Sequence, residues 1–239
     1  MLFRSLRFDY RGMGDSEGPL PHFESCGDDI AAAIDCTLAR VPGARRVVLW
    51  GLCDGASAAL LYLNDRRDER VLGLCLVNPW ARSNDGHARA QVKHYYARRL
   101  LQPAFWRKLL GGGVALSALR DASRAVAMAA RRGSATKGGA RAAAPRNFRE
   151  GMAVAAGTFG GPVLMTISGE DLTAREFLDY AAHEPTWRAL MQSPSCRRID
   201  LPGADHTLSD PADESRLHQT TLDWLEAIAA QTGGLQRPI

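Results

Sequence analysis

Three side chains in this sequence have the types that covalent acyl transfer requires: a thiol, an imidazole and a carboxylate. Cys53 lies in the segment Gly51-Leu52-Cys53-Asp54-Gly55, between an apolar run and a run rich in Ala and Leu. His206 and Asp171 each follow a later apolar run. We predict Cys53 as the nucleophile and His206 as the general base. We predict Asp171 as the acid that orients the imidazole, with Glu170 in reserve.

The segment around Cys53 is a G-x-C-x-G pattern at a strand-to-helix turn, which is a nucleophile elbow with cysteine in the serine position. We expect both flanking glycines to be needed, because side chains there would collide with the adjacent strand and helix. The positive end of the following helix would favour the thiolate. The backbone N–H of Asp54 would be one oxyanion donor. The alternative interpretation is a buried cysteine on a tight packing turn.

The predicted partners of Cys53 also have alternative roles. Asp171 could cap the helix that follows it, and Asp205 could be a surface turn residue. The remaining histidines do not follow a strand and are interpreted as structural or solvated: His22, His87, His94, His183 and His218. No cluster has metal-ligand spacing, and Gly12-Met13-Gly14 lacks the rest of a dinucleotide fingerprint. The sequence therefore implies no metal and no cofactor.

Apolar strands alternate with helices along the chain. The predicted strands are Leu6–Tyr10, Arg46–Trp50, Val71–Val77, Pro162–Ser168 and Cys196–Leu201. The predicted helices are one that Ser25 and Asp28 would cap and that ends near Val41, one over Gly55–Asn64, and one that begins at Asp210-Pro211. Because Arg46–Trp50 and Val71–Val77 are too uniformly apolar to have a solvated face, these two strands should be buried on both sides. This order indicates an α/β fold with a mostly parallel sheet flanked by helices.

A basic segment interrupts this alternation. Residues 82–150 contain 15 Lys and Arg against 3 Asp and Glu, a net charge of +12 in a chain of net charge +4. We predict a core formed by residues 1–81 and 151–239, with a basic helical lid in 82–150. The lid could lie on an anionic membrane surface or line a pocket for an acidic substrate. The alternative is a solvated face, and nothing in the segment resembles a nucleic-acid-binding fold.

The overall composition is that of an ordinary globular protein, with 46% apolar and 23% charged residues. This excludes a disordered chain and a coiled coil. No apolar stretch reaches the roughly 18 residues of a membrane span, and the N-terminus has no secretory signal pattern. Five cysteines without a Cys-x-x-Cys pair should be reduced and mostly buried. These features favour a cytoplasmic location.

Four segments, FDYRGMGDSEG, VLWGLCDGAS, SGEDLTA and GADHTLSD, carry a family resemblance. Together they resemble the α/β-hydrolases associated with the exosortase A system of Gram-negative bacteria, and more distantly the cysteine elbow resembles dienelactone hydrolase. The resemblance implies an α/β-hydrolase fold with Cys53, Asp171 and His206 as its triad. It also implies a setting in exopolysaccharide production and sorting, peripheral to the inner membrane. Because thiolate attack suits esters and thioesters better than amides, we expect a small-molecule acyl substrate of one of these two kinds.

The chain departs from this family pattern at its start. A complete member has about three strands and a helix before the FDYRG strand, including a loop that donates the second oxyanion N–H. Here FDYRG begins at Phe8. We therefore expect the first strands and one oxyanion donor to be missing, and an unprotected edge beside the first remaining strand. This gives an alternative function: a catalytically silent hydrolase-like protein that binds an anionic membrane or a partner through its basic lid.

Overall fold

The computed structural model describes residues 3–81 and 147–231. The chain divides into two units, Met1–Arg82 with Arg146–Ile239 and Ser83–Pro145, and every described residue belongs to the first. Nearly all of the predicted lid over 82–150 therefore lies outside the described residues. Its boundaries, its helices and its binding role stay predictions.

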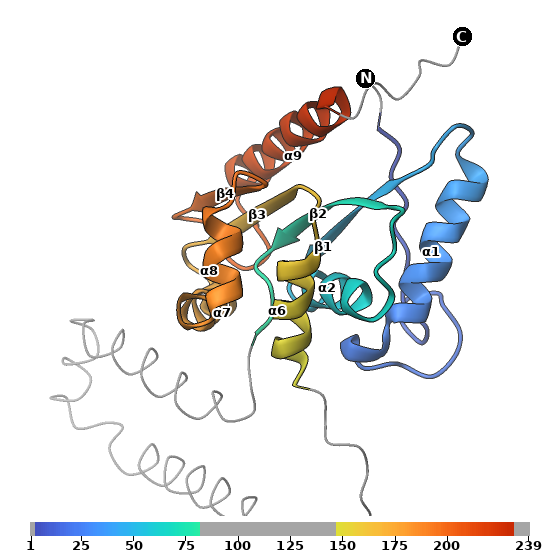
Figure 1. The fold of residues 1–239 in the computed structure, drawn as a ribbon, viewed down its shortest axis with the longest axis horizontal. Helices are drawn as coiled ribbons and strands as arrows, with labels where there is room; N and C mark the ends of the chain where they lie inside the picture. The colour runs from blue at the N-terminus through green and yellow to red at the C-terminus, as the bar shows by residue number, and fades with distance from the viewer. Residues whose placement is uncertain (1–2, 82–146, 232–239) are drawn as a thin grey trace, which may run out of the picture. The chain divides into compact units, whose positions relative to one another are not determined.

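A sheet of four parallel strands forms the centre of the described unit. Its order follows the chain: β1 (Val47–Leu52), β2 (Val71–Val77), β3 (Val163–Ser168) and β4 (Cys196–Leu201). All three pairings are parallel, so the carboxyl ends of the strands lie along one edge of the sheet (Figure 1). The predicted parallel sheet is confirmed, and these four strands lie close to their predicted bounds.

Helices cover both faces of this sheet. One core cluster joins it to five helices: α1 (Gly27–Arg40), α2 (Asp54–Arg66), α6 (Phe148–Thr158), α7 (Leu172–His183) and α8 (Pro185–Gln192). A second cluster joins it to α9 (Pro211–Gln231), which lies on the opposite side from α2 and α6 (Figure 1). Leu74 faces the first cluster and Cys75 the second, because successive side chains of a strand point to opposite faces. β2 is therefore buried on both sides.

The predicted strand at Leu6–Tyr10 is wrong. A strand exists only where its backbone groups pair with a neighbour, and residues 3–10 pair with none of the four described strands. β1 pairs only with β2 in the described part of the chain and is an edge strand there. Trp50 on β1 is 52% exposed, which corrects the prediction that the strand Arg46–Trp50 is buried on both sides.

The starts of two helices show which capping signals were informative. Ser25 and Asp28 do not cap α1: Ser25 ends a short 3₁₀ helix, η1 (Phe23–Ser25), and the N-cap of α1 is Cys26, with no side-chain cap. At α9, Asp210 Oδ1 accepts the N–H of Ala212 at 2.8 Å, so the predicted cap is confirmed. Among the described residues, no helix has both the length and the apolar character that crossing a bilayer requires.

Candidate active site

Cys53 lies at the turn between β1 and α2 in a strained backbone conformation. Its φ of 59° and ψ of −121° place it in a region that L-residues rarely adopt, at a cost of about 1–3 kcal/mol. The turn is held by hydrogen bonds: the Cys53 N–H donates to the Val77 carbonyl at 2.9 Å, and the Cys53 carbonyl accepts the Trp80 N–H at 3.2 Å. The surrounding structure thus enforces a sharp turn that presents Cys53 at the N-terminus of α2.

Asp54 is the first residue of α2, directly after Cys53. The N–H groups of the first helical turn have no carbonyl acceptor within their own helix. The Asp54 N–H therefore has the position that an oxyanion donor needs beside the thiol. This fits the predicted role of Asp54, which stays a prediction.

The two glycines that flank Cys53 differ in the space around them. A Cβ at Gly51 would lie 2.5 Å from the backbone nitrogen of Ala56 and 2.5 Å from the carbonyl carbon of Gly55. A Cβ at Gly55 would meet no atom within 4 Å in the described part of the chain. Only Gly51 is thus required by close approach of the backbone, and the expectation that both glycines are needed is wrong.

This difference predicts opposite effects for two alanine substitutions. Gly51→Ala should destabilise the protein by at least about 3 kcal/mol, because the new methyl group would overlap backbone atoms that cannot move independently. Gly55→Ala should leave the stability unchanged or raise it by up to about 1 kcal/mol, because alanine favours the helical conformation. Urea unfolding of the two variants measures both changes. Equal losses of stability would contradict the prediction.

Asp171 and His206 are in direct contact, although they come from loops after different strands. Asp171 Oδ2 lies 2.8 Å from His206 Nδ1. The Asp171 side chain is 5% exposed and the His206 side chain 36% exposed, so the carboxylate is buried beneath a ring that solvent and substrate can reach. A carboxylate at Nδ1 fixes the tautomer that leaves Nε2 free of a proton, as a general base requires.

The alternative role of Asp171 as a helix cap is also present. Its Oδ1 accepts the Thr173 N–H at 2.9 Å, and its Oδ2 accepts the Ala174 N–H at 3.2 Å. The two interpretations of Asp171 are therefore compatible, because one carboxylate has enough lone pairs for all three donors. Capping α7 holds the carboxylate in place for the imidazole.

The neighbouring carboxylates point elsewhere. Glu170, the reserve acid, is exposed, and its Oε1 lies 3.8 Å from an Arg175 nitrogen. Asp205 accepts the N–H groups of Thr207 and Ser209 and the Ser209 hydroxyl, and these bonds lower its pKa, the hydroxyl most. Asp205 is thus the surface turn residue of the alternative interpretation, and it shapes the loop that carries His206.

The loops after β3 and β4 are in close backbone contact. The Gly169 N–H donates to the Leu201 carbonyl at 2.8 Å, and the Glu170 N–H donates to the Ala204 carbonyl at 3.0 Å. A Cβ at Gly169 would lie 2.3 Å from the Pro202 carbonyl oxygen, so no larger residue fits there. These contacts bring the Asp171 and His206 loops together.

Asn78, which the sequence analysis did not single out, connects these loops to the Cys53 turn. It directly follows β2, and its side-chain Nδ2 donates to the His206 carbonyl at 3.2 Å. The preceding residue, Val77, accepts the Cys53 N–H. The end of β2 therefore holds both the backbone of the predicted nucleophile and the backbone of the predicted base. A polar residue immediately after a buried strand is the feature of the sequence that could have identified Asn78.

Other cysteines have environments that disfavour the thiolate. Burial raises the pKa of Cys75 to about 12 and that of Cys26 to about 11, the latter with a contribution from the negative charge of Asp29. Burial also raises the pKa of Cys196. These thiols stay protonated near neutral pH. All five cysteines are described and none is in a disulfide, but only Cys26 and Cys75 are buried, fewer than predicted.

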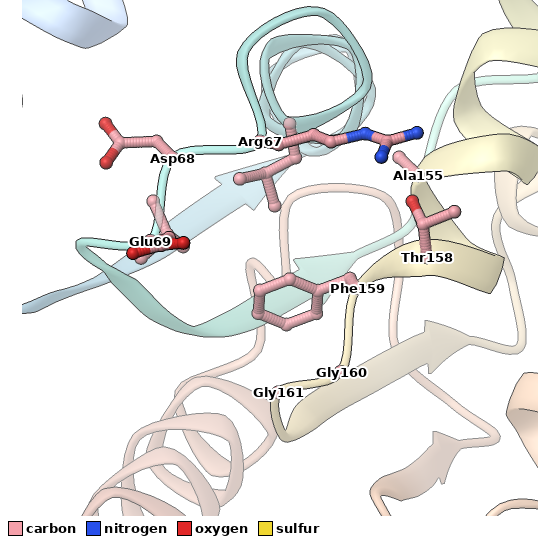
Figure 2. Close-up of a pocket in the computed structure, with 10 residues that line it drawn as sticks. Arg67, Asp68, Glu69, Ala155, Thr158, Phe159, Gly160 and Gly161 are labelled. Carbon is pink, nitrogen blue, oxygen red and sulfur yellow. The ribbon is translucent and has the colours of Figure 1, made fainter.

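A pocket of about 340 Å³ lies away from Cys53. It is lined by residues that include Arg67, Thr158, Phe159 and Gly161, at the ends of α2 and α6 (Figure 2). Val71 in its lining is the first residue of β2, so the pocket is at the amino ends of the strands. None of the predicted catalytic residues lines it. Within the described ranges, no group of three His, Cys, Asp or Glu side chains is arranged to hold a metal ion.

Comparisons with known proteins identify the family and the fold of this chain. Residues 3–218 match the profile of the alpha/beta hydrolase family. Two solved structures share the fold: a monoacylglycerol lipase from Paleococcus ferrophilus, with 18% identity and a TM-score of 0.53 over 92% of this chain and 82% of that chain, and BpoC from Mycobacterium tuberculosis, with 19% identity and a TM-score of 0.51 over 92% and 80%. The search of curated proteins found no match. The match over most of the chain shows that this protein belongs to the alpha/beta hydrolase family and has the α/β-hydrolase fold.

Proposed function

We propose that this protein is a cysteine-dependent acyl hydrolase or acyltransferase that acts on an ester or a thioester. The observation that carries the proposal is the 2.8 Å contact between Asp171 Oδ2 and His206 Nδ1, in a loop that Asn78 ties to the strand end holding Cys53. A buried carboxylate beneath an accessible imidazole is the arrangement of an acid–base pair. Membership of the alpha/beta hydrolase family supports a hydrolase, and one solved structure with the same fold is a monoacylglycerol lipase.

The reaction would proceed in two steps. In the first, the Cys53 sulfur attacks the carbonyl carbon while His206 Nε2 accepts the thiol proton, and the Asp54 N–H stabilises the oxyanion. The tetrahedral intermediate collapses, the bond to the leaving group breaks, and the imidazolium returns the proton to the departing alkoxide or thiolate. In the second, His206 removes a proton from water or an acceptor alcohol, and the oxygen of that molecule attacks the acyl carbon of the thioester. The carbon–sulfur bond then breaks, the acid or the new ester leaves, and the imidazolium returns the proton to the Cys53 sulfur.

The specific setting is part of the same proposal. The four quoted motifs support an exosortase-linked substrate in exopolysaccharide production, and the net charge of +12 in residues 82–150 supports an acidic substrate or an anionic membrane surface nearby. A catalytically silent protein would need only the basic segment. The enzyme needs Cys53, and this difference separates the two functions experimentally.

Capture of the acyl-enzyme tests the proposal. The full chain is mixed with p-nitrophenyl acetate, quenched in acid within seconds, and measured by intact mass and peptide mapping. We expect one acetyl group per chain, on the peptide that contains Cys53. The same protein unfolded in urea is the control, in which any acetyl groups should be spread over several nucleophiles. A folded protein that gains no acetyl group, or gains it elsewhere, would contradict the proposed function.

A further inference from the structure

We propose that Asn78 is a positioning residue that sets the place of His206 relative to Cys53; this inference rests on the proposed function. Asn78 directly follows β2 and is 0% exposed. Its φ of 46° lies in the left-handed region, which asparagine tolerates better than most residues with a side chain. Neither the predicted triad nor the predicted oxyanion donor includes it.

Both the oxygen and the nitrogen of the Asn78 side-chain amide form hydrogen bonds. Oδ1 accepts the Ser168 N–H at 2.8 Å, and Nδ2 donates to the Ser168 hydroxyl at 2.9 Å and to the His206 carbonyl at 3.2 Å. The orientation of the amide is fixed by its partners, because a backbone N–H can only donate and a carbonyl can only accept. One buried side chain thus joins the end of β2 to the end of β3 and to the loop after β4.

These bonds connect the backbone of Cys53 to the backbone of His206 through two adjacent residues, Val77 and Asn78. The Cys53 N–H is bonded to Val77, the residue next to Asn78. The His206 ring is held at Nδ1 by Asp171, and the His206 backbone is held at its carbonyl by Asn78. Asp171 fixes the tautomer, whereas Asn78 fixes how far the backbone of the base lies from the end of β2, to which the Cys53 N–H is hydrogen-bonded. Displacement by about 1 Å can cost 100-fold in rate.

The choice of variant follows from the backbone conformation. Asn78→Gly removes the amide, yet glycine adopts the left-handed conformation without strain. Arg67→Gly is the matched control, because Arg67 has the same φ of 46° at the exposed C-cap of α2. Ser168→Ala is the second control. It removes the Ser168 hydroxyl that contacts Asn78 but retains the bond to the His206 carbonyl.

Steady-state hydrolysis of p-nitrophenyl acetate by the full-length variants tests the inference. We expect Asn78→Gly to lower kcat by about 100-fold with little change in KM, and Arg67→Gly and Ser168→Ala to keep nearly the wild-type kcat. If Asn78 only joins β2 to β3, Asn78→Asp should keep nearly the wild-type kcat, because its carboxylate can still accept the Ser168 N–H and the Ser168 hydroxyl. If Asn78→Gly does not fold, Asn78→Asp takes its place, since it keeps the acceptor and loses the donor to His206.

Three outcomes would overturn the inference. A folded Asn78 variant with wild-type kcat would do so while leaving the proposed function intact. A loss of kcat in Asn78→Gly that Asn78→Asp does not share would assign Asn78 a structural role only. A wild-type protein whose turnover is the same as that of Cys53→Ala would refute the proposed function, and the inference would fall with it. Circular dichroism melting of each variant separates loss of rate from loss of fold.

Discussion

Cys53→Ala is expected to lower kcat/KM for a short-chain ester by up to about 10⁶-fold, the order of loss that follows removal of a covalent nucleophile. The substitution removes only the sulfur, so the turn, the Asp54 N–H and the pair of Asp171 and His206 should remain. Hydrolysis assays with p-nitrophenyl acetate and with acetyl-CoA measure the change. A rate unchanged by the substitution would show that Cys53 is not the nucleophile.

Cys36→Ala is the control for this substitution. Cys36 is a partly exposed cysteine in the middle of α1, and no predicted site residue lies on that helix. Its removal should leave kcat/KM unchanged. A comparable loss in both variants would point to a general effect of losing a thiol, which would contradict the specific role of Cys53.

The backbone of Cys53 adds a second measurable effect. Because φ at this position is 59°, Cys53→Gly should relieve backbone strain, and its free energy of unfolding should be about 1 kcal/mol higher than that of Cys53→Ala. The activity of the two variants should be equally low. Urea unfolding of the two variants compares their stabilities. Higher stability in the inactive glycine variant would indicate that the fold holds this residue in place for its chemistry.

Asp171→Asn is expected to lower kcat/KM by about 10⁴-fold while it leaves the fold intact. An asparagine has one side-chain acceptor, and asparagine is among the best N-cap residues, so α7 should still be capped. Its NH₂ group would then face His206 Nδ1. The ring would have to carry its proton on Nε2, where it could no longer accept the proton of a thiol.

Glu170→Gln is the matched control for Asp171→Asn. It makes the same chemical change at the adjacent carboxylate, an exposed side chain whose Oε1 lies 3.8 Å from an Arg175 nitrogen. The control should keep the wild-type kcat/KM, and thermal melting should show a loss of no more than about 1 kcal/mol in either variant. Loss of activity in Glu170→Gln with retention in Asp171→Asn would reverse the assignment of the acid.

Much of this fold could be predicted from the sequence because its central strands are continuous apolar runs. β2 and β3 are buried between helices, and such burial requires apolar side chains on both faces. The segment 6–10 alternates apolar residues with Arg7 and Asp9, a pattern that a strand can have, but a strand also needs a pairing partner, which the pattern alone cannot supply. The capping pattern at Ser25 failed for a related reason, since a 3₁₀ turn occupies that residue instead.

The site could be predicted in part because its residues follow strands that end at one edge. The positions of Asp171 and His206 after two such strands predict that they are partners, and the structure places them in contact. The sequence could not show that Asp171 both caps α7 and holds the imidazole, or that Asn78 bridges two loops. Those contacts depend on side-chain placement across residues far apart in the chain, and a single sequence carries no signal of which polar groups will meet.

The double use of Asp171 couples local order to catalysis. The oxygens that accept the Thr173 and Ala174 N–H groups belong to the carboxylate that orients His206. Fraying of the first turn of α7 would therefore release the imidazole even while the sheet stays folded. Conversely, a molecule that binds His206 in its catalytic orientation would stabilise the folded form of the first turn of α7, so that this turn would open less often. On heating, such an enzyme would then lose its activity at a lower temperature than the one at which its sheet unfolds.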